Sequence, residues 1–83
     1  MAHVVEELDA ATFEHALEIR RPTAWKACNG GMVAEATPKR GAKITAHYVR
    51  LAGRYFLLVG DVDMASAEAV RRVSEAIRER NEP

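Results

Sequence analysis

The chain lacks several features that would narrow its function. It has 83 residues, a single cysteine, only 6% aromatic residues and no apolar run long enough to span a bilayer. The lone cysteine, Cys28, excludes a disulfide within the chain and is typical of a reducing compartment, so we expect a cytoplasmic protein. The N-terminal segment, residues 1–21, also lacks the uninterrupted apolar stretch of a signal peptide.

An excess of charge of one sign is missing as well. Twelve Lys and Arg residues balance twelve Asp and Glu residues. Because overall charge favours neither nucleic acid nor an anionic membrane, we expect neither as a partner. The length fits one domain over residues 1–83, and a core this small, built largely from Ala and Val, gains stability when it is buried against a partner.

The N-terminal third predicts a short strand followed by a helix. Residues 3–8 form the candidate strand, and Asp9 is a candidate N-cap because its carboxylate accepts a free backbone N–H. Pro22 marks the boundary after the helix. One helical face would carry Phe13, Ala16 and Leu17. A strand over residues 16–20 stays open as an alternative, because apolar and charged residues alternate there.

The middle of the chain favours helix, with an interruption. Residues 23–38 contain many helix formers, namely Ala, Lys, Met and Glu. The run Asn29-Gly30-Gly31 breaks that pattern because glycine is costly inside a helix. We therefore expect either one kinked helix or two short pieces around a turn.

The C-terminal half predicts a hairpin and a helix. Residues 43–51 and 54–59 are two strands joined at Ala52-Gly53, where glycine supports a two-residue turn. Asp63 is the candidate N-cap of a helix over residues 64–80. One hairpin face carries Ile44, Ala46, Tyr48, Tyr55, Leu57 and Val59, and the other carries His47, Val49, Leu51, Phe56 and Leu58.

Both hairpin faces are apolar, which is the inference with the greatest consequence for function. The C-terminal helix covers one face, and the second face is left for residues 9–35 or for a partner. The sequence therefore predicts an interface at His47, Val49, Phe56 and Leu58. Arg50 and Arg54 flank the hairpin tip, where they could contact a small anionic metabolite.

The chemically reactive residues form no catalytic or metal pattern. His3, His15, His47 and Cys28 are the metal-ligand types, and their spacing matches no zinc motif. No acid and base pair emerges either. We therefore expect no catalytic residue, no metal and no cofactor, and we do not expect an enzyme. A small enzyme that uses Cys28 or His47 is the least favoured of three functional hypotheses; the other two are given below.

Several segments together resemble the bacterial microcompartment shell domain. The corner Gly60-Asp61-Val62, followed by residues 67–73, is similar to the last strand-to-helix corner of that family. Residues 23–27 and 32–36 look like its Ala-rich first helix, and residues 16–20 look like its first strand. The resemblance implies an α+β sandwich that assembles into cyclic hexamers and tiles a protein shell. It also implies that Leu51, Ala52, Gly53 and Arg54 at the hairpin tip line a central pore.

Taken together, the sequence predicts an α+β domain, a ferredoxin-like or shell-domain-like sandwich, with an antiparallel sheet and helices on one face. The first functional prediction is a self-associating structural protein that forms a cyclic homo-oligomer. The alternative is a small ferredoxin-like dimeric module that binds a ligand or a partner enzyme and regulates it.

Overall fold

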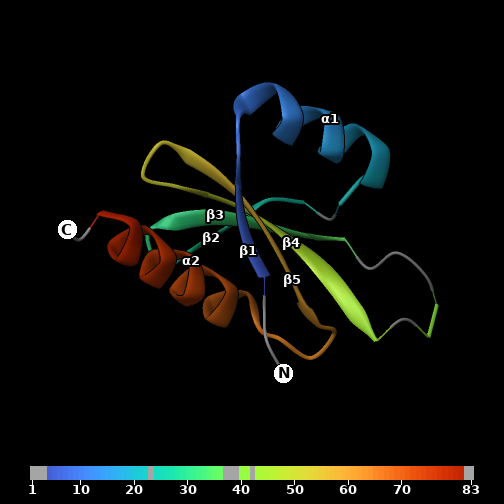
Figure 1. The fold of residues 1–83 in the computed structure, drawn as a ribbon. Coiled ribbons are helices and arrows are strands. Elements are labelled where there is room, and N and C mark those ends of the chain that lie inside the picture. Colours follow the sequence, from blue (N-terminus) through green and yellow to red (C-terminus); the bar gives the residue numbers. More distant parts are fainter. Residues whose placement is uncertain (1–3, 23, 37–39, 42, 82–83) are drawn as a thin grey trace.

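The protein folds as one antiparallel sheet that lies between two helices (Figure 1). The computed structural model describes residues 4–22, 24–36, 40–41 and 43–81. The sheet order is β1-β5-β4-β3-β2, and every neighbouring pair is antiparallel. This arrangement confirms the α+β class. The elements are β1 (Val4–Leu8), α1 (Ala10–Arg20), β2 (Lys26–Cys28), β3 (Gly31–Ala36), β4 (Ile44–Leu51), β5 (Arg54–Asp61) and α2 (Ser66–Asn81).

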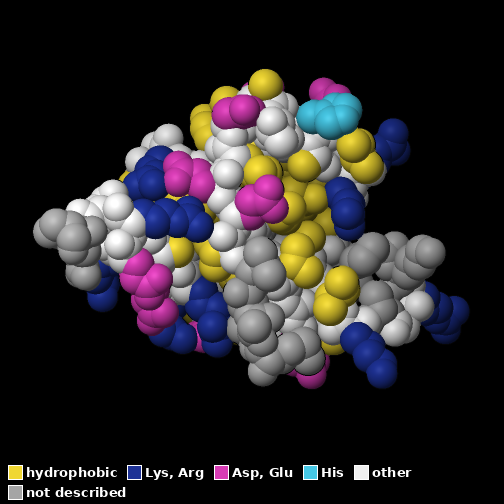
Figure 2. All heavy atoms as spheres, in the orientation of Figure 1, with side chains coloured by type: hydrophobic (Ala, Val, Ile, Leu, Met, Phe, Trp, Pro, Cys, Tyr) yellow, Lys and Arg dark blue, Asp and Glu magenta, His cyan; other side chains and the backbone are white. Residues whose placement is uncertain are grey.

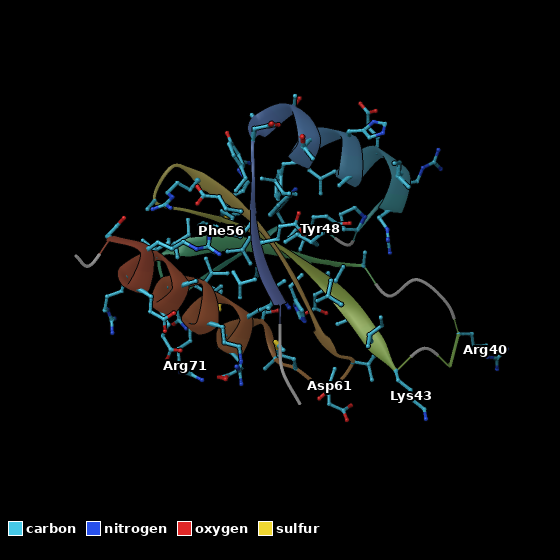
Figure 3. The ribbon with its side chains drawn as sticks, in the orientation of Figure 1. Arg40, Lys43, Tyr48, Phe56, Asp61 and Arg71 are labelled. Atoms are coloured by element: carbon cyan, nitrogen blue, oxygen red, sulfur yellow. The ribbon has the colours of Figure 1, made fainter. Side chains whose placement is uncertain are left out.

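The two helices lie on opposite faces of the sheet, so the prediction of helices on one face is wrong. Successive side chains of a strand point to opposite faces. Tyr48 packs with Phe13 of α1, whereas its neighbour Val49 packs with Val70 and Val73 of α2. Figure 3 shows Tyr48 and Phe56 in the sheet between the helices. The physical reason is the one noted in the sequence, since two apolar faces each need a cover.

The central hairpin confirms its predicted register. Leu51 pairs with Arg54 across the turn, and the two faces divide the side chains as expected. Ala52 and Gly53 both have left-handed backbone conformations, with φ of 54° and 71°. Two successive positive φ values match the right-handed twist of the flanking strands, which is why a two-residue turn closes this hairpin.

The described residues of the middle segment, 24–36, are not helical, which corrects the prediction of a helix over residues 23–38. Within this segment β2 and β3 form a second hairpin, and β3 continues the sheet by pairing with β4. Asn29 and Gly30 form its turn with φ of 49° and 84°. Helix propensity is a weak preference, and pairing along β4 overrides it. The turn agrees with the alternative of two short pieces around a turn, although the pieces are strands, and Asn-Gly is a strong hairpin signal.

Helix α1 is confirmed, and the alternative of a strand over residues 16–20 is wrong. Asp9 caps the helix, since its Oδ1 accepts the N–H of Thr12 at 2.7 Å. Arg21 ends the helix in the left-handed region, and its N–H bonds the Leu17 carbonyl at 2.9 Å.

In several of the segments that resemble the shell domain, the secondary structure differs from that of the family. Residues 16–20, compared with a first strand, are helical, and the described parts of the two segments compared with a first helix contain strands. The resemblance therefore depends on the central hairpin and on the corner at residues 60–62.

Helix α2 begins two residues later than expected. It was predicted to start at Met64 behind an Asp63 cap, but it starts at Ser66. The N–H of Met64 instead bonds the Asp61 carbonyl at 2.9 Å, which closes a turn before the helix. Val70 and Val73 are buried. The core beneath the helix consists of Val33, Val49, Phe56, Val70 and Val73.

Candidate functional site

The residues predicted to form an interface lie in the core of the folded chain. His47, Val49, Phe56 and Leu58 are all 0% exposed. Helix α2 packs over this face through Val70 and Val73. The structure therefore corrects the prediction of an exposed contact surface at these four positions, because the C-terminal helix covers that face.

One residue of this core, His47, is a buried polar group without a hydrogen-bond partner among the described residues. Neither ring nitrogen has a hydrogen bond within the described part of the chain. The nearest charged group is Glu35 on β3, whose Oε1 lies 3.9 Å from His47 Nδ1. The same oxygen accepts the Ser66 hydroxyl at 2.6 Å and lies 3.9 Å from Lys26 Nζ. Glu35 thus connects the sheet to the first residue of α2.

Burial favours the neutral form of His47. Burial lowers the pKa of the imidazole below its ordinary value of 6.5; the Glu35 carboxylate partly opposes this, and Lys26 adds to it. The Ser66 hydroxyl donates to Glu35 and not to the imidazole, so the cluster lacks the contact that activates a serine nucleophile. The sequence singled out His47, but it gave no sign of Glu35 or Ser66 beside it.

The other residues considered for metal binding do not come together. Across residues 4–22, 24–36, 40–41 and 43–81, no group of three or more His, Cys, Asp or Glu side chains is placed to hold a metal ion. Cys28 is half-buried and packs against the core under α2. His15 is exposed on α1, and His3 lies outside the described residues.

The predicted pore or ligand loop lines a shallow hollow at the hairpin tip. Residues 51–54 border it together with Met32, Arg50 and Tyr55, and its volume is about 280 Å³. The Arg54 side chain is already paired, since it donates two hydrogen bonds to the Glu7 carboxylate at 2.7 and 2.8 Å. The hydrogen bond raises the pKa of Arg54 and lowers that of Glu7. Arg50 is therefore the better candidate for an anion contact.

The α1 side of the sheet is only partly covered. Helix α1 lies over the end nearer the hairpin tip, where Phe13 contacts Trp25, Tyr48 and Tyr55. Toward the opposite end of β4, Ile44 is 48% exposed. Figure 2 shows hydrophobic side chains gathered on the surface beside α1. A hollow of about 100 Å³ lies there, lined by Arg20, Ile44, Thr45, Ala46, Tyr48, Leu57 and Val59.

The two edges of the sheet are less open to association than this face. At the β1 edge, Arg80 donates to the Val5 carbonyl at 3.1 Å and also lies 3.6 Å from Glu7. Charged side chains at an edge discourage the addition of another strand. At the other edge, β2 has only three residues. Short edge strands offer few backbone groups for pairing.

Comparison with protein-family models, with curated proteins and with solved structures finds no match to this chain. Among the helices of the described residues, none has the length and apolar character needed to cross a bilayer.

Proposed function

We propose that the protein is a self-associating structural domain, and that two copies pair through the uncovered end of the α1-side face. We call this surface the distal patch and define it as Ile44, Leu57 and Val59, which line the same hollow. The observation that supports the proposal is its exposure, since Ile44 is a large apolar side chain that is 48% exposed and borders a hollow lined by Leu57 and Val59. Adjoining exposed apolar side chains often mark an interaction surface.

A second copy of the chain is the partner that best fits this surface. In a two-fold dimer the same patch meets itself, so apolar area is matched by apolar area on both sides. Pairing through the α1-side face also leaves out the two sheet edges, where Arg80 covers β1 and β2 has only three residues. The proposal keeps the predicted self-association but moves the interface from the buried α2 side to the opposite face.

The cyclic oligomer expected from the shell-domain resemblance stays a prediction. It requires residues 51–54 to gather around an axis, and the distal patch lies toward the opposite end of β4 and β5. A pair formed through the distal patch leaves both hairpin tips free. The ligand-binding module is favoured as a second candidate by a separate observation, the hollow beside Arg50.

The association surface is tested by placing a charge in it. We expect Ile44→Lys to raise the dimer dissociation constant by about tenfold or more, because a buried lysine would lose its hydration at the interface. Sedimentation velocity across a concentration series measures the change. Because Ile44 is half exposed in the subunit, we expect the variant to fold, which circular dichroism would verify.

The matched control is Met32→Lys. Met32 is also an exposed apolar strand residue, 37% exposed, but it lies near the hairpin tip, away from the distal patch. We expect this variant to associate like the wild type. Equal loss of association in the two variants, or none in either, would place the interface elsewhere.

A further inference from the structure

A second surface, separate from the distal patch, has the form of a small binding pocket. We call it the Trp25 pocket; its volume is about 120 Å³ and it is lined by Phe13, Glu14, Leu17, Trp25, Arg50 and Tyr55. Its rings are held in place by Phe13, which lies 6.0 Å from the Trp25 ring and 5.0 Å from the Tyr55 ring, centroid to centroid. Phe13 is 2% exposed, whereas Trp25 and Tyr55 are half-buried and present ring surface to a ligand.

The cation at this pocket is held in position and has no anionic partner. The Arg50 guanidinium lies 5.7 Å from the centroid of the Trp25 ring. Stacking on an aromatic ring leaves the N–H groups of a guanidinium free for a carboxylate, which they bind as a fork. Among the described residues, the Arg50 side chain has no hydrogen bond or ion pair, in contrast to the Arg54 side chain, which is bound to Glu7.

The pocket is also lined by an acidic side chain, Glu14, that has no ion pair among the described residues. Glu14 projects from α1 and is exposed. A free carboxylate and a free guanidinium therefore border one apolar pocket. A simple anion would satisfy Arg50 but would be repelled by Glu14. A zwitterion would satisfy both groups.

We propose that the Trp25 pocket binds a free amino acid with a branched aliphatic side chain. The carboxylate of the ligand would pair with Arg50, its ammonium group with Glu14, and its side chain would pack against Trp25, Leu17 and Tyr55. The volume favours an aliphatic side chain, since a cavity of about 150 Å³ is the size that accepts a benzene ring. This inference is independent of self-association and would hold for a monomer.

The chain provides its own probe for this proposal. Trp25 is its only tryptophan, so intrinsic fluorescence reports on the pocket directly. We expect L-leucine to change this fluorescence saturably, with matching heat in isothermal titration calorimetry. Isoamylamine, which lacks the carboxylate, and isocaproate, which lacks the amino group, should each bind at least about tenfold more weakly.

Two neutral substitutions test the charged groups. We expect Arg50→Gln and Glu14→Gln each to weaken leucine binding by about tenfold or more. Glu18→Gln, on the same helix, and Arg78→Gln, on the other helix, should leave it unchanged, since neither residue lines the pocket.

Three results would overturn the proposal. The first is no saturable signal from leucine in either fluorescence or calorimetry. The second is binding that Arg50→Gln leaves intact. The third is isocaproate binding as tightly as leucine together with an unaffected Glu14→Gln, which would mean that the pocket recognises a carboxylate and not an amino acid.

Discussion

Replacing Phe13 with alanine is expected to remove a large part of the stability of the domain. Phe13 is the only buried residue of α1, and it contacts the rings of Trp25, Tyr48 and Tyr55. Truncation of a buried phenylalanine costs about 3–5 kcal/mol, while a small domain has a total stability of only about 5–15 kcal/mol. Helix α1 would lose its main anchor, and the aromatic residues beneath it would become exposed.

Urea unfolding followed by circular dichroism measures this effect. The matched control is His15→Ala, an exposed position on the same helix, for which we expect a change within about 0.5 kcal/mol. If the two variants unfolded at the same urea concentration, α1 would not depend on Phe13, and the packing on the α1 side would be wrong.

Replacing His47 with leucine is expected to increase stability and to remove an acid sensitivity. The imidazole is fully buried and both of its nitrogens lack a partner among the described residues. A buried polar group that lacks a hydrogen bond costs about 1–3 kcal/mol, and leucine is apolar and similar in size. We therefore expect the free energy of unfolding at neutral pH to rise by about 1 kcal/mol or more.

The pH dependence follows from the direction of the pKa shift. Burial lowers the pKa of His47 in the folded state, whereas the unfolded residue titrates near 6.5. Between these two values the unfolded chain binds more protons, so stability falls as the pH drops below about 6.5. Stability at higher pH is unaffected by this group. The carboxylates with lowered pKa, Glu7, Asp9 and Glu68, lose their contribution only below their ordinary values of 4.5, 3.8 and 4.5.

Unfolding of the wild type and of His47→Leu should be compared between pH 5 and pH 8. We expect only the wild type to lose stability between pH 6.5 and pH 5. The variant His15→Leu, at an exposed position on α1, controls for the change from histidine to leucine and should lose stability like the wild type. A less stable His47→Leu variant, with the same acid sensitivity as the wild type, would show that the imidazole is satisfied in the folded protein.

Much of the fold could be predicted from the sequence where local chemistry and packing agree. The Ala52-Gly53 turn, the register of the hairpin and the Asp9 cap follow from local residue preferences, and the structure confirms them. The prediction of helix was wrong for the described residues 24–36, which contain two strands. There, helix-forming side chains compete with an Asn-Gly turn, and the cross-strand pairing that decides the outcome comes from β4, which follows later in the chain.

The candidate site was harder to predict because it also depends on contacts between residues that are far apart in the sequence. The sequence showed that both hairpin faces are apolar, but it could not show which helix covers which face. Arg50 and Tyr55 were visible on the hairpin, whereas Trp25 and Glu14 reach the same pocket from a loop and from α1. The pairing of Arg54 with Glu7 depends on β1 lying beside β5, a contact between residues far apart in the sequence.

Self-association is tested most directly by the mass of the wild-type protein in solution. We would measure it by sedimentation equilibrium over a concentration range that reaches tens of micromolar. The proposed pairing predicts a mass that rises with concentration toward twice the 9.2 kDa of the chain. A mass of 9.2 kDa at every concentration would contradict it and would leave the Trp25 pocket as the better indication of function.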